Sequence, residues 1–176
     1  MKRKKQVVLF IATSLDGYIA TKHESLEWLF NVEGEGDNGI AAFMSRIDTI
    51  LMGRRTYDWV INEADTFPYQ EQAVYVFTQS NMCDTENVQV VKQEIASFVK
   101  GLQDEKGKDI WLLGGGKLVS TFIELNLIDE IIITVAPVLL GEGIPLFRAG
   151  NLPLNLKLRG VQTFNQFTEL HYRVIK

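Results

Sequence analysis

The sequence predicts an α/β fold built around a mixed, mostly parallel sheet that ends in an antiparallel hairpin. The first observation is that short apolar segments rich in β-branched residues alternate with segments of helical periodicity along most of the chain. Such alternation favours parallel strands joined by right-handed crossovers. The second observation is that two segments of alternating polarity flank Asn165 and Gln166 near the C-terminus, which is the pattern of a hairpin.

The predicted strands are short apolar runs that end at turn-forming residues. Residues 7–12 form a continuous apolar run typical of a strand buried on both faces, and Asp16 and Gly17 break it. Runs of the same kind predict the later strands, and the terminal hairpin contributes two more. The expected ranges are residues 49–52, 73–77, 88–91, 110–113 and 130–136, followed by 156–164 and 168–175.

The predicted helices carry apolar side chains three and four residues apart. In residues 24–30, Leu26, Leu29 and Phe30 share one helical face, and Ser25 is a candidate N-cap. The same spacing predicts four more helices, at residues 38–47, 54–61, 94–103 and 117–125.

Length and composition indicate one cytoplasmic domain that spans residues 1–176. Hydrophobic residues make up 46% of the chain and charged residues 23%, which is ordinary globular usage. A net charge of −4 does not favour a nucleic-acid surface. The basic cluster at residues 2–5 is interpreted as a solvated, frayed N-terminus. The apolar run behind it is too short for a membrane span and lacks a signal-peptide cleavage site.

Cysteine and histidine are too scarce for several common kinds of site. Cys83 is the only cysteine, so an internal disulfide is excluded. The two histidines, His23 and His171, form no HExxH motif and no His/Cys cluster, so we expect no metal site. No G-x-S-x-G motif supports a hydrolytic triad.

Polar residues and glycines follow three of the predicted strands. These strand ends are Gly53, Arg54, Arg55 and Thr56; Thr78, Gln79 and Ser80; and Gly114, Gly115, Gly116 and Lys117. In an open α/β sheet, ligands bind outside the carboxyl ends of the strands. Helices are predicted directly after both glycine loops, and a helix N-terminus with nearby cations suits a phosphate. The sequence therefore predicts a phosphate-bearing cofactor at this edge, although a tight strand-to-helix turn explains either loop structurally.

Neither glycine loop has the spacing of a known nucleotide fingerprint. The loops lack the G-x-G-x-x-G pattern of Rossmann folds, and no G-K-[ST] sequence closes a Walker A motif. A Rossmann site and a kinase-type phosphate loop are therefore not supported.

The motifs and their order resemble the dihydrofolate-reductase superfamily, and most closely the reductase domain at the C-terminal end of bacterial bifunctional riboflavin-biosynthesis deaminase-reductases. The resemblance runs nearly end to end. It is carried by the segments SLDGYIA at 14–20, LMGRRTY at 51–57, LLGGGKL at 112–118, LIDE at 127–130 and VAPVLLG at 135–141. It implies a three-layer fold and a free-standing member of that group.

The resemblance also assigns a cofactor, NADPH. It places Ala12, Ile19 and Ala20 at the nicotinamide and the two glycine loops, with Lys117 and Leu118, around the pyrophosphate. Thr78, Gln79 and Ser80 would then lie near the adenosine ribose. Their hydroxyl and amide donors, helped by Arg54 or Arg55, are a modest signal for a 2′-phosphate.

The sequence departs from this family at positions that concern the substrate. Dihydrofolate reductases carry an acid where Ser25 stands, and Thr134 corresponds to the partner of that acid. The riboflavin reductases carry lysine, glutamate and lysine where Tyr18, Leu113 and Val138 stand. The missing lysines could have gripped a phosphorylated sugar, so a flatter, less charged substrate is expected.

The candidate substrate-site residues combine aromatic walls with a few polar groups. Tyr18, Trp28 and Tyr57 could stack on a planar ring, although core packing explains aromatic residues equally well. Asp16, Ser25 and Thr134 are the candidate catalytic residues, and a turn is the structural alternative for Asp16.

These residues support an NADPH-dependent reductase that transfers hydride to a planar heterocycle of the pteridine or pyrimidine class. The family activity would be reduction of 5-amino-6-(5-phosphoribosylamino)uracil. A non-enzymatic NADPH- or nucleotide-binding protein and a divergent dihydrofolate reductase are the alternatives. We expect a homodimer, because residues 131–135 and 138–140 carry more apolar surface than a small sheet covers, and related domains commonly pair through this region.

Overall fold

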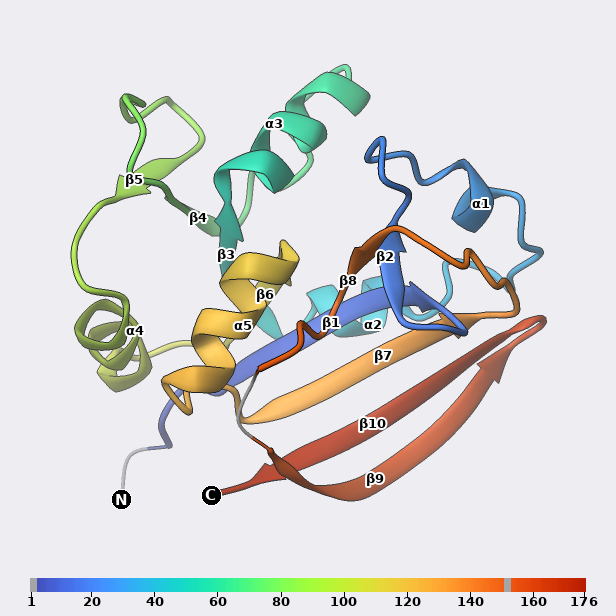
Figure 1. Cartoon of the computed structure of the whole chain (residues 1–176). Helices are drawn as coiled ribbons and strands as arrows, with labels where there is room; N and C mark the ends of the chain where they lie inside the picture. The colour runs from blue at the N-terminus through green and yellow to red at the C-terminus, as the bar shows by residue number, and fades with distance from the viewer. Residues whose placement is uncertain (1–2, 151–152) are drawn as a thin grey trace.

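The computed structural model describes residues 3–150 and 153–176. Its main sheet has eight strands in the order β5-β4-β3-β6-β1-β7-β10-β9 (Figure 1). The pairs from β5 to β7 are all parallel, whereas β10 runs antiparallel to β7 and β9 antiparallel to β10. The predicted mixed, mostly parallel sheet with a C-terminal hairpin is therefore confirmed.

The strands of the main sheet lie close to the predicted runs. They are β1 (Val7–Ser14), β3 (Ile47–Gly53), β4 (Ala73–Phe77), β5 (Gln89–Val91), β6 (Asp109–Gly114), β7 (Glu130–Ala136), β9 (Asn155–Phe164) and β10 (Phe167–Ile175). The sequence reading missed two short strands, β2 (Tyr18–Ala20) and β8 (Ile144–Pro145), which pair with each other in a separate two-stranded ribbon. Because they have three and two residues, they have no periodicity to detect.

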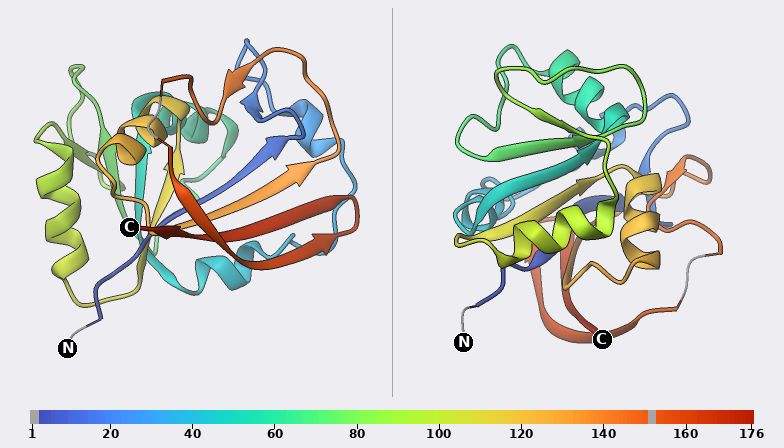
Figure 2. Two further views of the ribbon diagram at one scale, coloured as in Figure 1. Left: turned by 60° about the horizontal axis from the view of Figure 1, so that its bottom comes forward. Right: turned by 90° about the vertical axis from the view of Figure 1, so that its left-hand side faces the viewer.

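Helices cover both faces of the main sheet. On one face α4 (Ile95–Asp104) and α5 (Gly116–Glu124) pack on a cluster that includes Leu9 and Leu112. On the other face α2 (Ile40–Met44) and α3 (Arg54–Glu63) contribute to a cluster around Trp111 (Figure 2). The three-layer arrangement therefore follows from alternate side chains of buried strands pointing to opposite faces.

Two predicted helices are much shorter than expected. The range 24–30 contains only α1 (Glu27–Phe30), whose N-cap is Leu26 and not Ser25. Glu24 has a φ of 63°, which an α-helix does not allow. The range 38–47 contains only α2, because Gly39 has a φ of 77° and Ile47 already belongs to β3. The apolar spacing in both ranges comes from packing of irregular chain and not from a continuous helix.

The basic N-terminus is not frayed where the structure describes it. Lys5 is only 5% exposed, and its Nζ lies 2.6 Å from Asp48 Oδ1 and 2.9 Å from Thr49 Oγ1. Arg3 pairs with the buried Asp109 at 2.8 Å. The predicted solvated end is therefore wrong for Lys5, which Asp48 and Thr49 bind in the interior. Arg3 is solvated as expected, with a side chain that is 70% exposed, although it is held by Asp109. Lys2 lies outside the described residues.

The apolar surface expected on residues 131–135 is mostly internal. Strand β7 lies between β1 and β10, and Ile131 and Ile132 are 1% and 6% exposed. Of the run 138–140, only Leu139 is strongly exposed, at 71%. The stated reason for a homodimer is therefore wrong for β7, because neighbouring strands and helices already cover it.

Candidate functional site

The three predicted strand ends lie side by side. Strands β4, β3 and β6 are neighbours in the sheet, with Gly53 in register with Phe77 and Met52 in register with Gly114. Parallel strands end at the same edge, so the segments that follow them meet there. The predicted convergence of the two glycine loops and the Thr78 segment is confirmed as geometry.

The two glycine loops are joined by a hydrogen bond. The backbone N–H of Gly115 donates to Thr56 Oγ1 at 3.1 Å, and a Cβ added to Gly115 would lie 3.4 Å from that oxygen. Gly114 has a φ of 118°, which side chains other than hydrogen disfavour. The loops therefore form one surface of backbone between α3 and α5.

Both helices begin at this surface without a side-chain cap. The N-cap positions are Gly53 for α3 and Gly115 for α5, and neither supplies a side-chain hydrogen bond to the first turn. The first N–H groups of a helix lack intrahelical acceptors and carry a partial positive charge. Two adjacent helix N-termini of this kind can bind the oxygens of a phosphate or pyrophosphate.

The basic side chains near the loops differ in their exposure to solvent and in their pairing with carboxylates. Arg54 Nε pairs with Asp58 on the same helix at 2.7 Å. The side chain of Arg55 is 86% exposed and lies 3.7 Å from Glu24. Lys117 is exposed in the first turn of α5, whereas Leu118 is 8% exposed and belongs to the core. Leu118 could therefore contribute backbone to a cofactor but not its side chain.

The Thr78 segment forms a compact hydroxyl pair. Thr78 Oγ1 lies 2.8 Å from Ser80 Oγ and accepts a hydrogen bond from Ser80 N at 3.1 Å, and Gln79 is exposed. Thr78 N donates to Val91 O at 3.4 Å, so Lys92 directly follows the contact. Lys92 is an exposed cation beside this segment. It was not predicted from the sequence, because it follows β5 and lies fourteen positions after Thr78.

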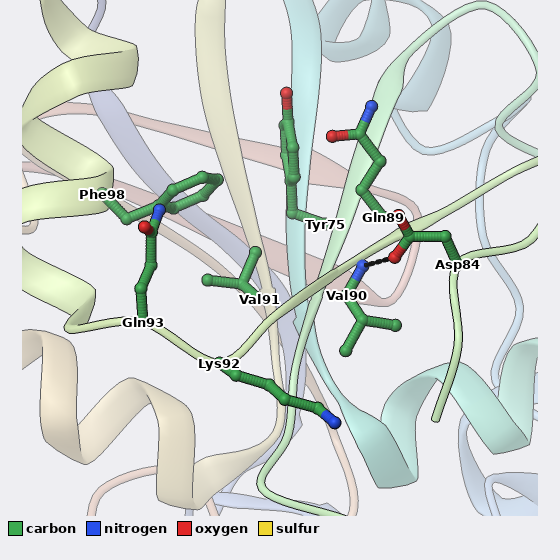
Figure 3. Close-up of a pocket in the computed structure, with 8 residues that line it drawn as sticks. All are labelled: Tyr75, Asp84, Gln89, Val90, Val91, Lys92, Gln93 and Phe98. Carbon is green, nitrogen blue, oxygen red and sulfur yellow. Dashed lines mark hydrogen bonds between the residues drawn. The ribbon is translucent and has the colours of Figure 1, made fainter. Parts of the chain in front are cut away.

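A hollow of about 330 Å³ adjoins this segment at the edge of the sheet (Figure 3). Tyr75 and Phe98 meet there edge to face, with ring centroids 5.0 Å apart, and Asp84 Oδ1 accepts from Val90 N at 2.8 Å. Lys92 extends away from the two rings (Figure 3). The hollow therefore has an aromatic side, and its charged lining residues are one cation, Lys92, and one carboxylate, Asp84.

A larger cleft of about 480 Å³ lies between the α1 region and α3. Of the predicted residues it contains Ser25 and Arg55. Four carboxylates and one arginine line it, so negative charge dominates. The lining residues are His23, Glu24, Ser25, Leu26, Glu27, Phe30, Arg55, Asp58, Trp59, Asn62 and Glu63.

The predicted substrate-site aromatics come from three different elements. Tyr18 is in the β2–β8 ribbon and packs against Gly143, whereas Tyr57 packs on the core face that contains Trp111. Trp28 lies in α1, and its indole Nε1 is buried without a hydrogen-bond partner among the described residues. An unpaired buried donor costs about 1–3 kcal/mol, so Trp28 Nε1 is a donor that a ligand could satisfy.

Asp16 is held in a turn by hydrogen bonds from two segments. Its carboxylate accepts from Ser14 Oγ at 2.6 Å, from Gly141 N at 2.8 Å and from Leu140 N at 3.2 Å. The hydrogen bond from the Ser14 hydroxyl is the main cause of the lowered pKa of Asp16. Desolvation, the next largest effect, opposes it, and the backbone donors of Gly141 and Leu140 lower the pKa further. Asp16 therefore links the loop after β1 to the loop after β7.

Ser25 and Thr134 do not contact each other. Ser25 Oγ accepts from Glu27 N at 3.3 Å, which is a local turn contact. Thr134 is buried on β7, and its Oγ1 donates to Glu169 Oε2 at 3.3 Å. The carboxylate partner of Thr134 is therefore Glu169 on β10, which was not among the site residues predicted from the sequence.

The remaining predicted cofactor residues lie along β1 and β2. Ala12 is in register with Thr134, and Ala20 is in register with Ile144 of β8. Ile19 packs against the core on the α4 and α5 face. The described residues contain no group of three His, Cys, Asp or Glu side chains that could hold a metal ion. They also contain no helix with the length and hydrophobicity needed to cross a bilayer.

Comparison with protein families gives one match that covers most of the chain. The model of the RibD C-terminal domain matches residues 5–169. The uncharacterized Bacillus subtilis protein YwjB is 44% identical over 170 residues, which are 96% of this chain and 98% of the relative. A second uncharacterized B. subtilis protein, YyaP, is 34% identical over 175 residues, with 93% and 91% coverage.

Solved structures with the same fold include free-standing and longer proteins. A protein from Shewanella sp. PV-4 with a proposed role in riboflavin biosynthesis superimposes with a TM-score of 0.88 at 31% identity, covering 97% of this chain and 99% of that one. A Thermotoga maritima deaminase and 5-amino-6-(5-phosphoribosylamino)uracil reductase superimposes with a TM-score of 0.71 at 17% identity. This chain covers 57% of that longer protein, and the likeness shows the shared fold.

Proposed function

The chain belongs to the RibD C-terminal domain family, and from this premise we propose that it is an NADPH-dependent reductase of riboflavin-biosynthesis type. The hydride acceptor would be a planar heterocycle of the pteridine or pyrimidine class. The observation that carries the proposal is the pair of uncapped helix N-termini at Gly53 and Gly115, which are joined through Thr56.

In this proposal the cofactor lies across the carboxyl ends of β4, β3, β6 and β1. The pyrophosphate would bind the backbone N–H groups of the two glycine loops, with Lys117 nearby. The nicotinamide would lie towards Ala12 and the β2–β8 ribbon. When bound, NADPH supplies the hydride, so the chain's own task is to hold donor and acceptor close together and exclude water.

The 2′-phosphate would lie at Thr78, Gln79 and Ser80. The hydroxyl pair of Thr78 and Ser80 offers donors, and Lys92 supplies the cation that this triplet lacks. We expect calorimetry to show tighter binding of NADPH than of NADH. We also expect Lys92→Met to reduce the difference between the affinities for NADPH and NADH. Equal affinities of the wild type for the two cofactors would contradict the assignment of NADPH.

The charge of the cleft beside α3 favours an acceptor without a phosphate group. Glu24, Glu27, Asp58 and Glu63 line it together with Arg55, so a phosphorylated sugar would meet mostly repulsion. The residues at Tyr18, Leu113 and Val138 point the same way, because none is charged. Dihydrofolate itself is less well served, since Ser25 cannot supply a carboxylate.

The reductase proposal is tested by the loss of reduced-nicotinamide absorbance with pteridine, flavin and pyrimidine acceptors. We expect oxidation of NADPH with at least one planar acceptor and none without acceptor. Mass spectrometry of small molecules released from the purified, denatured protein would identify bound ligands directly. NADPH binding with no turnover of any acceptor would instead support a non-enzymatic nucleotide-binding protein, the role that Ser25 in place of an acid favours.

A further inference from the structure

Glu169 is a buried carboxylate without a cationic partner among the described residues. It is 6% exposed and accepts hydrogen bonds from Gln162 Nε2 on β9 and from Thr134 Oγ1 on β7, both neutral donors. A buried carboxylate without a compensating cation costs several kcal/mol of folding free energy. Structural need alone therefore explains Glu169 poorly.

Other buried or half-buried acids of the same sheet are paired with cations. Asp109, which is 2% exposed at its side chain, contacts Arg3 and Arg46 at 2.8 and 2.7 Å. Glu130 contacts Arg46 and His171, each at 3.1 Å. These acids lie at the opposite end of the strands from the glycine loops. Glu169 differs from them in both partner type and position.

The sheet register places Glu169 in one row with predicted site residues. Ala12 of β1 is in register with Thr134 of β7, and Thr134 is in register with Glu169 of β10. Residues in register point to the same face of a sheet. Ala12 is the expected nicotinamide floor, so Glu169 lies two strands away on the same face.

A separate segment of the chain lies over this face at the hairpin tip. The carbonyl of Glu33 accepts from Gln166 N at 3.2 Å, and Gly39 lies against the ring of Phe164. Phe164 and Gln162 are two positions apart on β9, and Gln162 is in register with Glu169, so the three side chains share a face. Glu33 and Gly39 therefore contact the hairpin tip, next to the face to which Glu169 points.

Two acceptor positions of the Glu169 carboxylate remain for a ligand. An ionised carboxylate offers about four lone-pair directions, of which Gln162 and Thr134 use two. Two parallel N–H groups match a carboxylate in a bidentate geometry. Such a pair is the ring N–H and the adjacent 2-amino group of a 2-amino-4-oxopyrimidine or a 2-amino-4-oxopteridine.

We propose that Glu169 is the substrate-binding carboxylate of this chain, that it takes an N–H/NH₂ edge of a planar heterocycle, and that it acts from β10 in place of the acid absent at Ser25. The proposal rests on the proposed reductase function for the position of the nicotinamide. Thr134 and Gln162 orient the carboxylate, and the ring would lie on the face that carries Ala12.

Calorimetry with 2-amino-4-oxopyrimidine as the probe tests this proposal on the whole chain, with and without saturating NADPH. The variant Glu169→Gln keeps the shape and removes the charge. The matched control is Glu130→Gln, a strand carboxylate outside the site. We expect Glu169→Gln to weaken probe binding at least about tenfold, because charge-assisted bonds are roughly twice as strong as neutral ones. We expect Glu130→Gln to bind the probe as tightly as the wild type does. We also expect Glu169→Gln to bind NADPH with the affinity of the wild type.

Thermal unfolding without ligand separates binding from a structural role. A buried ligand-binding carboxylate without a cation destabilises the folded state. Glu169→Gln should therefore keep or raise the midpoint temperature of unfolding. Glu130→Gln should lower the midpoint, because His171 loses its carboxylate partner and Arg46 loses one of its two. A lowered midpoint for Glu169→Gln together with unchanged probe binding would overturn the proposal, as would no probe binding by the NADPH-bound wild type. Failure of NADPH to bind the wild type would contradict the cofactor assignment alone.

Discussion

The glycines at 114, 115 and 116 serve three different physical needs. Gly114 has a backbone conformation that other residues disfavour, with a φ of 118°. Gly115 lets the backbone N–H approach Thr56 Oγ1, and an added Cβ would lie 3.4 Å from that oxygen. Gly116 lies against β8, where an added Cβ would be 2.6 Å from Pro145 O. Three glycines in a row therefore combine an unusual backbone conformation, a close approach to Thr56 and a packing contact with β8, and sequence alone did not separate the three.

Asp16 should make the stability of the protein depend on pH in the acid range. Its folded pKa is lowered by Ser14, Gly141 and Leu140, so its contribution is present above the unfolded pKa and is lost as the pH falls through the folded value. Urea unfolding of Asp16→Asn should show lower stability than the wild type near neutral pH. The difference should shrink below about pH 3.9, the ordinary aspartate pKa.

The outcome that contradicts this role is a stability difference that stays constant from neutral to acid pH. Such a result would mean that the carboxylate charge contributes nothing and that the Asn side chain disturbs the turn sterically. Retained reductase activity in Asp16→Asn would further favour the turn role over a catalytic one.

At the scale of elements, the ribbon of β2 and β8 connects the predicted cofactor loop to the segment after β1. Tyr18 is in register with Pro145 and packs against Gly143, while Pro145 O lies beside Gly116 of α5. A change at Gly116 should therefore be transmitted to β8 and from there to β2. Neither strand is long enough for sequence periodicity to reveal it.

Gly116→Ala should destabilise the protein by about 1–3 kcal/mol, the usual cost of overpacking a well-packed site. The added methyl group would have to displace Pro145 of β8. The matched control is Gly101→Ala in α4, where nothing lies within 4 Å of the added Cβ. That change should stabilise by about 0.5–1 kcal/mol through helix propensity. Equal effects of the two changes in urea unfolding would contradict the packing role of Gly116.

At the scale of the whole molecule, the strands of the main sheet and their mostly parallel pairing could be predicted because they depend on continuous apolar runs that alternate with helical segments. Residues 7–12 and 110–113 are apolar on both faces, and each became a central buried strand. The convergence of the glycine loops followed from parallel topology. The burial of Glu169 could not be predicted, because its contact with Thr134 joins residues 35 positions apart in the sequence. Lys5 escaped prediction for the same reason, since Asp48 lies 43 positions away.

A homodimer with two-fold symmetry remains a prediction, and the exposed apolar surface is on β9 instead of β7. Leu156, Leu158 and Val161 are 41%, 53% and 56% exposed on a strand whose outer edge has no partner in the sheet. Light scattering at micromolar concentration should give about twice the 20.0 kDa chain mass. The double change Leu158→Lys and Val161→Lys should shift the mass measured by light scattering towards 20.0 kDa. A wild-type protein that scatters only as a single chain would contradict the dimer.

The central claim is that the two glycine loops hold the phosphates of NADPH, and calorimetric titration of Gly115→Asp tests it most directly. The change places a carboxylate against the pyrophosphate, and like charges about 4 Å apart repel by about 1 kcal/mol in water and about 4 kcal/mol near a protein surface. With steric exclusion added, NADPH affinity should fall at least about 100-fold. Gly101→Asp, which adds the same charge to the open side of α4, should leave it unchanged. A Gly115→Asp protein that keeps its circular dichroism spectrum and binds NADPH as tightly as the wild type would contradict the claim.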